Sequence, residues 1–305
     1  MSLRLFSLII YLICSFTITF AEDQPTYLPQ NPGTPLGSRP DISPDYFQQG
    51  VYYIIDAEFS PETKIISGTE KLTYTNNSSD TLDFVYFHLY QNAFVPGSYQ
   101  DIFDMGEGRE EIHHLTDDDK GGSIIYSIQD GDGASLSYTI DDTNLKVRLP
   151  RPLPPGEPAI LITEFETKFS ETSARMHKGD DYFVATQWYP KIAVYDHHRG
   201  WNNDYHLGRE FYGDFGTFEW NLTLPENYIV GATGRLLNRD EVLPKDLMEK
   251  LDIRNFKEKP LGEDASVIIE PTDSTKTWVY RADQVHDIAW IASPSFRIGE
   301  AEWDV

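Results

Sequence analysis

The sequence predicts an all-β fold in which antiparallel twisted sheets form a saddle or sandwich, with at most one or two short helices. About a dozen short segments rich in apolar residues follow one another, and clusters of Gly, Pro, Asn and Asp separate them. A single segment has the spacing of an amphipathic helix. Short strands joined by turns bury their apolar faces by packing as layers, and this gives the fold class.

The first three expected strands open the folded part of the chain. Residues 51–59 are apolar on one face and mixed on the other, and a turn follows them. The pattern resumes over 65–76, and the turn cluster at 76–80 precedes an aromatic-rich run over 82–90. We expect these three strands to form an antiparallel meander.

The same spacing continues to the end of the chain. Further strands are expected at 122–129, 135–140, 144–149, 159–169, 216–224, 228–235, 266–270, 277–281 and 287–292. A proline-rich corner is expected at 150–158. The helical segment is 241–251, because Leu243, Leu247 and Leu251 recur every four residues with charged residues between them.

Residues 1–21 are expected to be a cleavable secretory signal, with Arg4 before an apolar run that ends in small residues at Ala21. A membrane anchor is the alternative, but the run is shorter than the roughly 20 apolar residues of a span. Residues 22–45 are proline-rich and predict an extended linker, so residues 46–305 are the folded domain. We expect a secreted or periplasmic, cell-envelope protein with no membrane span after signal removal.

Composition excludes several classes of function. The 49 acidic and 25 basic residues give a net charge of −24, which repels nucleic acid and acidic bilayers. The one cysteine, Cys14, lies within the signal, where Ile13 before it disfavours lipid attachment. The mature chain therefore has no disulfide, no thiol nucleophile and no cysteine metal ligand.

No complete catalytic motif is present. A hydrolytic zinc site typically uses His-Glu-x-x-His on a helix, and the chain lacks that string. His206 and Glu210 have a related spacing, but Gly208 and Gly213 beside them argue against a helix. A Gly-x-Ser-x-Gly elbow and a phosphate-binding loop are also missing from the sequence.

Two other groups of candidate ligands have simpler explanations. The pairs 113–114 and 197–198 are adjacent histidines in polar surroundings, where we expect solvated loops. Asp130, Asp132 and Asp141 resemble parts of a calcium loop, but Ser135 stands where the sharp turn requires Gly. A hairpin turn accounts for these residues better than a calcium site.

The most informative stretch is the centre of the chain. Residues 185–191, 193–196 and 210–216 mix Trp, Tyr and Phe with Gln, Asp and Glu. Such mixtures often line a binding cleft, and the alternative is a packed aromatic corner. The residues themselves leave both interpretations open.

Taken in order, several strings resemble the membrane alanyl aminopeptidase family of zinc metallopeptidases, the gluzincin group. These strings are Tyr-Phe-Gln-Gln-Gly at 46–50, Ile-Ser-Gly-Thr-Glu at 66–70 with Tyr-Thr-Asn-Asn-Ser at 74–78, His-Leu-Tyr-Gln-Asn-Ala-Phe at 88–94, Thr-Gln-Trp-Tyr-Pro at 186–190 with Tyr195-Asp196, and Val-His-Asp-Ile-Ala-Trp at 285–290. The resemblance covers 46–305. It implies an N-terminal β-saddle that precedes a thermolysin-like catalytic domain and helps to roof the active site.

The resemblance implies zinc in the full-length family member, bound by the catalytic domain, and a peptide substrate held through that domain. Those elements would lie beyond residue 305, so we expect no catalytic residue and no metal ligand within this chain. Thr186-Gln187 matches the family segment whose Gln faces the α-amine of the substrate. Gln187, with Trp188 and Tyr189 beside it, is the candidate substrate-binding set, although Tyr189 departs from the acidic residue or Gln of the family pattern.

The favoured hypothesis is therefore the N-terminal portion of a secreted zinc aminopeptidase, a metallopeptidase that removes N-terminal residues from peptides. On this hypothesis residues 1–305 are a fragment that is inactive alone, because the ligands that hold zinc are missing. One alternative is a secreted β-domain that binds peptide or glycan by itself. Another is an inactive scaffold within a larger envelope assembly.

Overall fold

The computed structural model describes residues 46–173, 175–179, 181–205, 212–248 and 269–295. The chain divides into the units Met1–Pro44 and Asp45–Val305, and the description below concerns the second. The expected signal, the linker and the pair His206 and Glu210 lie outside the described residues. No helix in the described part is long and apolar enough to span a membrane.

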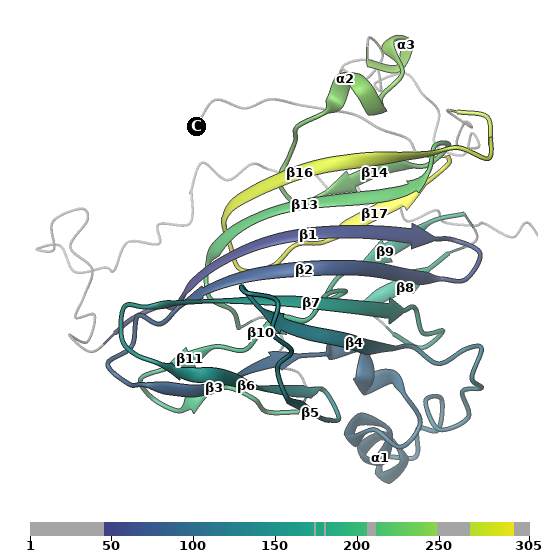
Figure 1. The fold of residues 1–305 in the computed structure, drawn as a ribbon. Coiled ribbons are helices and arrows are strands. Elements are labelled where there is room, and N and C mark those ends of the chain that lie inside the picture. The colour runs from purple at the N-terminus through teal and green to yellow at the C-terminus, as the bar shows by residue number, and fades with distance from the viewer. Residues whose placement is uncertain (1–45, 174, 180, 206–211, 249–268, 296–305) are drawn as a thin grey trace, which may run out of the picture. The chain divides into compact units, whose positions relative to one another are not determined.

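A seven-stranded sheet is the largest element, in the order β15-β16-β13-β1-β2-β7-β4 (Figure 1). Its strands are β1 (Gly50–Ser60), β2 (Ile65–Thr75), β4 (Gly122–Asp130), β7 (Pro158–Lys168), β13 (Gly216–Pro225), β15 (Arg235–Leu236) and β16 (Thr275–Val285). All neighbours pair antiparallel except β1 and β13, which run parallel. The expected all-β class is confirmed.

The other strands of the described residues form three smaller sheets. The sheet β10-β3-β6-β5 contains β10 (Lys191–Ile192), β3 (Leu82–His88), β6 (Asn144–Leu153) and β5 (Tyr138–Asp141). The sheet β14-β17-β9-β8 contains β14 (Ile229–Ala232), β17 (Trp290–Ser293), β9 (Phe183–Ala185) and β8 (Met176–Lys178). A short ribbon joins β11 (Tyr195–Asp196) to β12 (Gly200–Trp201).

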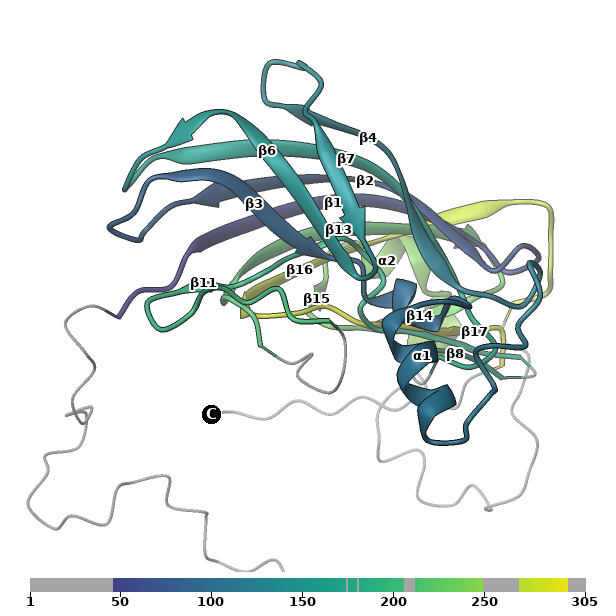
Figure 2. The ribbon, with the colours of Figure 1, turned by 90° about the horizontal axis from the view of Figure 1, so that it is seen from below.

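The seven-stranded sheet has a buried face and a polar face because its strands alternate. In β1 the residues Val51, Tyr53, Ile55, Ala57 and Phe59 are buried, and the residues between them are more exposed. Aromatic rings join this inner face to the sheet β14-β17-β9-β8, since Phe59 lies 4.8 Å from Phe183 and 5.2 Å from Trp290 between ring centroids. Both views show this smaller sheet on one side of the large one (Figures 1 and 2).

The helices are short. They are a 3-10 turn, η1 (Tyr90–Phe94), and three α-helical pieces, α1 (Tyr99–Gly106), α2 (Arg239–Val242) and α3 (Lys245–Met248). The helix expected over 241–251 is therefore wrong as a continuous element, and its last three residues lie outside the described part. Pro244 separates α2 from α3, because the residue before a proline is pushed out of the helical region and Leu243 has extended dihedral angles.

The expected meander is correct for β1 and β2 but wrong for β3. β2 pairs with β7, whereas β3 leaves this sheet and pairs with β6 and β10. The corner expected over 150–158 is shorter, because β6 continues to Leu153 and β7 already begins at Pro158. Of the strand expected over 266–270, only Ile269 and Glu270 are described, and they lie outside any strand.

We predict that Gly216→Ala destabilises the fold at the start of β13. A Cβ at this position would lie 2.2 Å from the backbone oxygen of Val51, so the parallel pairing of β1 and β13 must shift. We expect the free energy of unfolding in urea, followed by tryptophan fluorescence, to fall by about 1–3 kcal/mol. The matched control is Gly231→Ala in β14, where the nearest atom is 3.5 Å away and the change should stay within about 0.5 kcal/mol. Equal losses in both variants would contradict the prediction.

Candidate functional site

The candidate residues Gln187, Trp188 and Tyr189 lie in the short connection between β9 and β10. Gln187 has a φ of 56°, which turns the chain in a conformation that residues with a Cβ seldom adopt. All three side chains are buried among the described residues. The structure therefore brings them to the inner side of the large sheet, and their contact with a substrate stays a prediction.

Trp188 packs against inward-facing aromatic residues of the large sheet. Its indole is 0% exposed and lies 6.5 Å from Phe165 on β7 and 6.0 Å from Trp220 on β13, between ring centroids. The Tyr189 ring is 5.4 Å from the Trp188 ring. These contacts give both residues a packing role, as in an aromatic corner.

The Tyr189 hydroxyl also contacts a partly buried ion pair. Its hydroxyl donates to Asp287 Oδ1 at 2.8 Å, and Lys191 Nζ lies 3.1 Å from Asp287 Oδ2. Burial is the main cause that raises the pKa of Tyr189, and the Asp287 carboxylate adds to it. The tyrosine is therefore a protonated hydrogen-bond donor that orients Asp287.

Tyr53 connects this cluster to the centre of the large sheet. Its ring stacks on Phe218 at a centroid distance of 4.5 Å, and its hydroxyl accepts a hydrogen bond from the Ile192 backbone N–H at 3.0 Å. The end of β10 is thus fixed to β1, and this positions the segment that begins at Gln187.

Glu70 is a buried carboxyl group on the inner face, and it was not among the site residues expected from the sequence. It faces Ile55 and Thr163 in the strand register and is 0% exposed. Neither carboxyl oxygen has a hydrogen-bond partner among the described residues, and burial raises the pKa of Glu70 well above its usual range. Its position was readable from the sequence, because Ile66, Glu70 and Leu72 share one face of a strand.

Asp214 is a second buried acid close to the same cluster. Its Oδ1 accepts the Gln49 backbone N–H at 3.1 Å, and its Oδ2 has no partner within the described part of the chain. Burial raises the pKa of Asp214 to about 7, and the hydrogen bond from Gln49 opposes that shift. Asp214 therefore changes its protonation near neutral pH.

Gln187 offers an unused amide in this environment. Neither its Nε2 nor its Oε1 has a partner among the residues described. Its backbone oxygen accepts from Gln91 Nε2 at 3.3 Å, and Ser173 Oγ in turn donates to Gln91 Oε1 at 3.0 Å. The backbone is held while the side-chain amide remains able to accept from an amine or to donate to a carbonyl.

The described residues do not fit a zinc site, because no three His, Cys, Asp or Glu side chains converge in this part of the chain. His113 contacts Asp101 and His114 contacts Glu110, while the rings of His197 and His198 pack against each other with centroids 3.8 Å apart. Asp130 Oδ1 accepts from the N–H groups of Asp132 and Ala134, which makes the expected hairpin turn.

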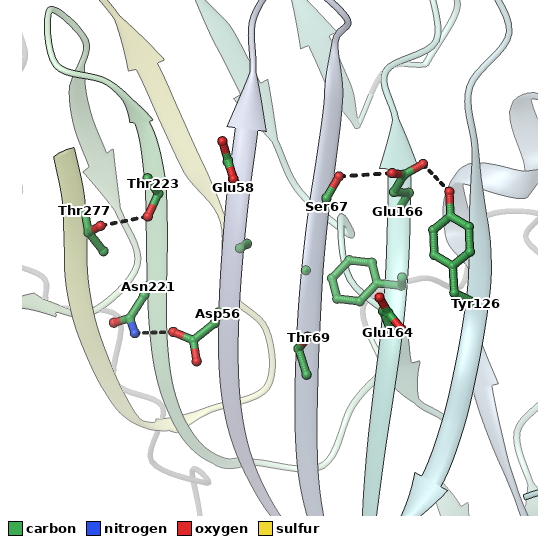
Figure 3. A pocket seen from close by; sticks show the side chains of 13 residues that line it. Asp56, Glu58, Ser67, Thr69, Tyr126, Glu164, Glu166, Asn221, Thr223 and Thr277 are labelled. Carbon is green, nitrogen blue, oxygen red and sulfur yellow. Dashed lines mark hydrogen bonds between the residues drawn. The ribbon is translucent and has the colours of Figure 1, made fainter. Parts of the chain in front are cut away.

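The opposite face of the large sheet carries an open groove of about 490 Å³ (Figure 3). Figure 3 shows carboxylates and hydroxyls from neighbouring strands lying across it. Glu166 accepts hydrogen bonds from Ser67 at 3.2 Å and from Tyr126 at 2.7 Å, and Asn221 donates to Asp56. The groove has no local signature in the sequence, because it combines outward residues from strands far apart in the chain.

The chemistry of the two faces differs. The inner cluster contains two buried acids with raised pKa values, one ion pair and an unused amide. It can orient a polar group, but it has no activated nucleophile among the described side chains. The outer groove can accept hydrogen bonds from hydroxyls or cations.

We predict that Asp214→Asn removes a pH dependence of stability. The pKa of Asp214 is about 7 in the folded state and about 3.9 when unfolded, so the folded state binds more protons between these values. Wild-type stability relative to the variant should therefore fall by up to about 1.4 kcal/mol per pH unit from about pH 4 to pH 7, and then level off. Urea unfolding of both proteins across that range measures it. A difference that is independent of pH would contradict the prediction.

We also predict that Lys191→Met lowers the free energy of unfolding by about 3 kcal/mol, because Asp287 loses its ion-pair partner in a largely buried site. The double variant Lys191→Met/Asp287→Asn should recover part of this loss, since the introduced amide carries no charge and keeps an oxygen that accepts from Tyr189. A double-mutant cycle in urea measures the coupling. Additive losses would show that the two residues do not interact.

The sequence matches no protein-family model and no curated protein. Among solved structures, the chain is similar to an M1 zinc metallopeptidase mutant from Deinococcus radiodurans bound to a Tyr-Ser-Ala substrate, with a TM-score of 0.46 and 14% identity over 81% of this chain and 43% of that chain. It is also similar to a crystal structure of the M1 zinc metallopeptidase from Deinococcus radiodurans, with a TM-score of 0.45 and 14% identity over 81% of this chain and 42% of that one. The chain thus spans less than half the length of these proteins. At these TM-scores and this identity, the similarity does not assign a family.

Proposed function

We propose that residues 46–305 form the N-terminal β-domain of a zinc aminopeptidase related to the membrane alanyl aminopeptidases. In this proposal the protein is secreted or held in the cell envelope, and a catalytic domain supplies the zinc ligands and the groups that hydrolyse the peptide bond. The β-domain supplies a wall of the substrate cleft.

The unused amide of Gln187 carries this proposal. The side chain is buried, its φ is 56°, and neither polar atom of the amide has a partner among the described residues. A buried amide without partners costs about 1–3 kcal/mol, which favours a ligand that satisfies it. The resemblance implies that this residue faces the α-amine of the substrate, and in the proposal Gln187 Oε1 accepts a hydrogen bond from that amine.

Trp188 and Tyr189 would support Gln187 in this role. Trp188 is fixed between Phe165 and Trp220, and Tyr189 is fixed by Asp287. A residue that binds an amine needs such rigid neighbours, because displacement by about 1 Å weakens a hydrogen bond strongly.

The test is hydrolysis of an aminoacyl anilide by the complete gene product, with the zinc content measured by mass spectrometry. We expect activity that a chelator abolishes, and we expect the 305-residue chain alone to be inactive with zinc added. A complete gene product that neither holds zinc nor cleaves the anilide would disprove the aminopeptidase proposal, and chelator-sensitive activity of the chain alone would disprove its division of roles.

Gln187→Ala tests the role of the amide separately. We expect KM for the anilide to rise about tenfold, since the lost hydrogen bond to a charged amine is worth about 1.5–3 kcal/mol. The matched control is Gln48→Ala, because Gln48 is exposed and its Nε2 bonds to Tyr46. An unchanged KM in Gln187→Ala with normal folding would exclude contact with the amine.

A second candidate is a secreted β-domain that binds a glycan or peptide by itself, and the outer groove favours it. The groove presents Asp56, Glu166 and Thr223 with other polar groups on a rigid sheet (Figure 3). Saturable binding of a glycan by the chain, lost in a groove variant and unchanged in Gln187→Ala, would support this candidate.

A further inference from the structure

Helix α1 is inverted relative to the usual pattern of a surface helix. Its buried residue is Asp101, which is 2% exposed, whereas Ile102 is 64% exposed and Phe103 is 47% exposed. Tyr99 and Met105 are also exposed. A helix on a protein surface normally turns its apolar stripe inward, so the outward face of α1 requires another explanation.

Polar contacts at its first turn hold α1 in this orientation. Ser98 Oγ accepts the Asp101 backbone N–H at 3.1 Å, and Asp101 Oδ2 accepts the Gly97 N–H at 2.7 Å. The Asp101 carboxylate also lies 3.2 Å from His113 Nδ1, and Tyr99 N–H donates to Asp142 Oδ2 at 2.5 Å. The inverted orientation is therefore built by specific hydrogen bonds and by an N-cap.

The exposed apolar side chains form one surface. Tyr99, Ile102 and Phe103 follow the spacing of one helix face, and Met105 is three residues after Ile102. Tyr205 extends this surface, because its ring stacks on Tyr99 at a centroid distance of 5.0 Å. Figure 1 shows α1 at the lower end of the domain, below β4 and β5.

The segment that carries this surface is acidic, and its exposed carboxylates are called the acidic rim below. Residues 99–120 contain eight acidic residues and two basic ones, Arg109 and Lys120. Both cations are already used, since Arg109 pairs with Asp104 at 2.5 Å and Lys120 with Asp117 at 2.7 Å. Glu107 and Glu111 are exposed and lie near Arg109, whose pKa they raise together with the main contributor, Asp104.

We propose that the outward face of α1 is a docking site for a cationic amphipathic polypeptide segment, with apolar side chains on α1 and Lys or Arg side chains on the acidic rim. The charge decides between occupants. A second copy of this chain would bring the same acidic rim and a net charge of −24, and an anionic bilayer would be repelled for the same reason. A cationic segment gains both apolar burial and charge attraction.

The test measures binding to the complete gene product of a fluorescent helical peptide made of leucine and lysine, by anisotropy. We expect the variant Ile102→Ser/Phe103→Ser to weaken binding at least about tenfold, which corresponds to about 1.4 kcal/mol. The variant Glu107→Gln/Glu111→Gln should weaken binding less and reduce its dependence on salt, because it removes two rim charges. All substituted residues are exposed, and thermal melts check that the variants fold.

The matched control is Leu237→Ser, which removes a side chain that is 47% exposed beside β15, at the edge of the large sheet opposite β4. Its binding should equal that of the wild type. Equal binding of a leucine and glutamate peptide, or no binding of the lysine peptide, would overturn the proposal. Self-association or binding to phosphatidylcholine vesicles that is lost in Ile102→Ser/Phe103→Ser would overturn it in favour of a second copy or a lipid surface.

Discussion

The inner face of β1 is the constraint on which the rest of the structure depends. β1 pairs antiparallel with β2, which follows it in the chain, and parallel with β13, which begins far later at Gly216. Its inward residues Tyr53 and Phe59 contact elements of both smaller four-stranded sheets, through Ile192 and Phe183. β1 and β2 are neighbours in the chain, so this pair can form early in folding. The inner face is complete only after β13 has paired with β1. Because this pairing closes a long loop, it limits the rate of folding.

The polar groups buried in this core are a second constraint on the fold, because their burial costs free energy. Glu70 has no hydrogen-bond partner among the described residues, Asp214 satisfies one oxygen, and Lys191 and Asp287 pair with each other. Burial of such groups opposes folding unless they are neutral or paired, which is why both lone acids hold their protons at higher pH than free carboxyls. A core built for stability alone would use apolar residues here. The pair Lys191 and Asp287 has a further role, because Asp287 accepts a hydrogen bond from Tyr189 and so orients the segment that begins at Gln187.

The sequence predicts local patterns well and distant contacts poorly. The alternation of apolar residues predicted the positions of β1 and β2 and their buried face, and turn residues predicted the ends of these two strands. The same period could have revealed Glu70 on that face. The contact of Tyr189 with Asp287 could not be found in this way, because 98 positions separate the two residues and no local pattern links them. β3 left the expected meander for the same reason, since strand pairing depends on which distant surface is available.

Glu70 is a charged residue type in the core, whereas α1 has apolar side chains on the surface. Both are exceptions to the usual burial of apolar residues, and their consequences differ. Glu70 acts within the core, where an acid without partners lowers stability as it ionises. The exposed side chains of α1 leave the core intact, and their effect falls on association with other molecules. A bare apolar face would attract any apolar surface, but the surrounding carboxylates repel copies of the same chain and attract cations. The acidic residues at this helix therefore favour solubility and also make binding selective, because they repel anionic apolar partners and attract cationic ones.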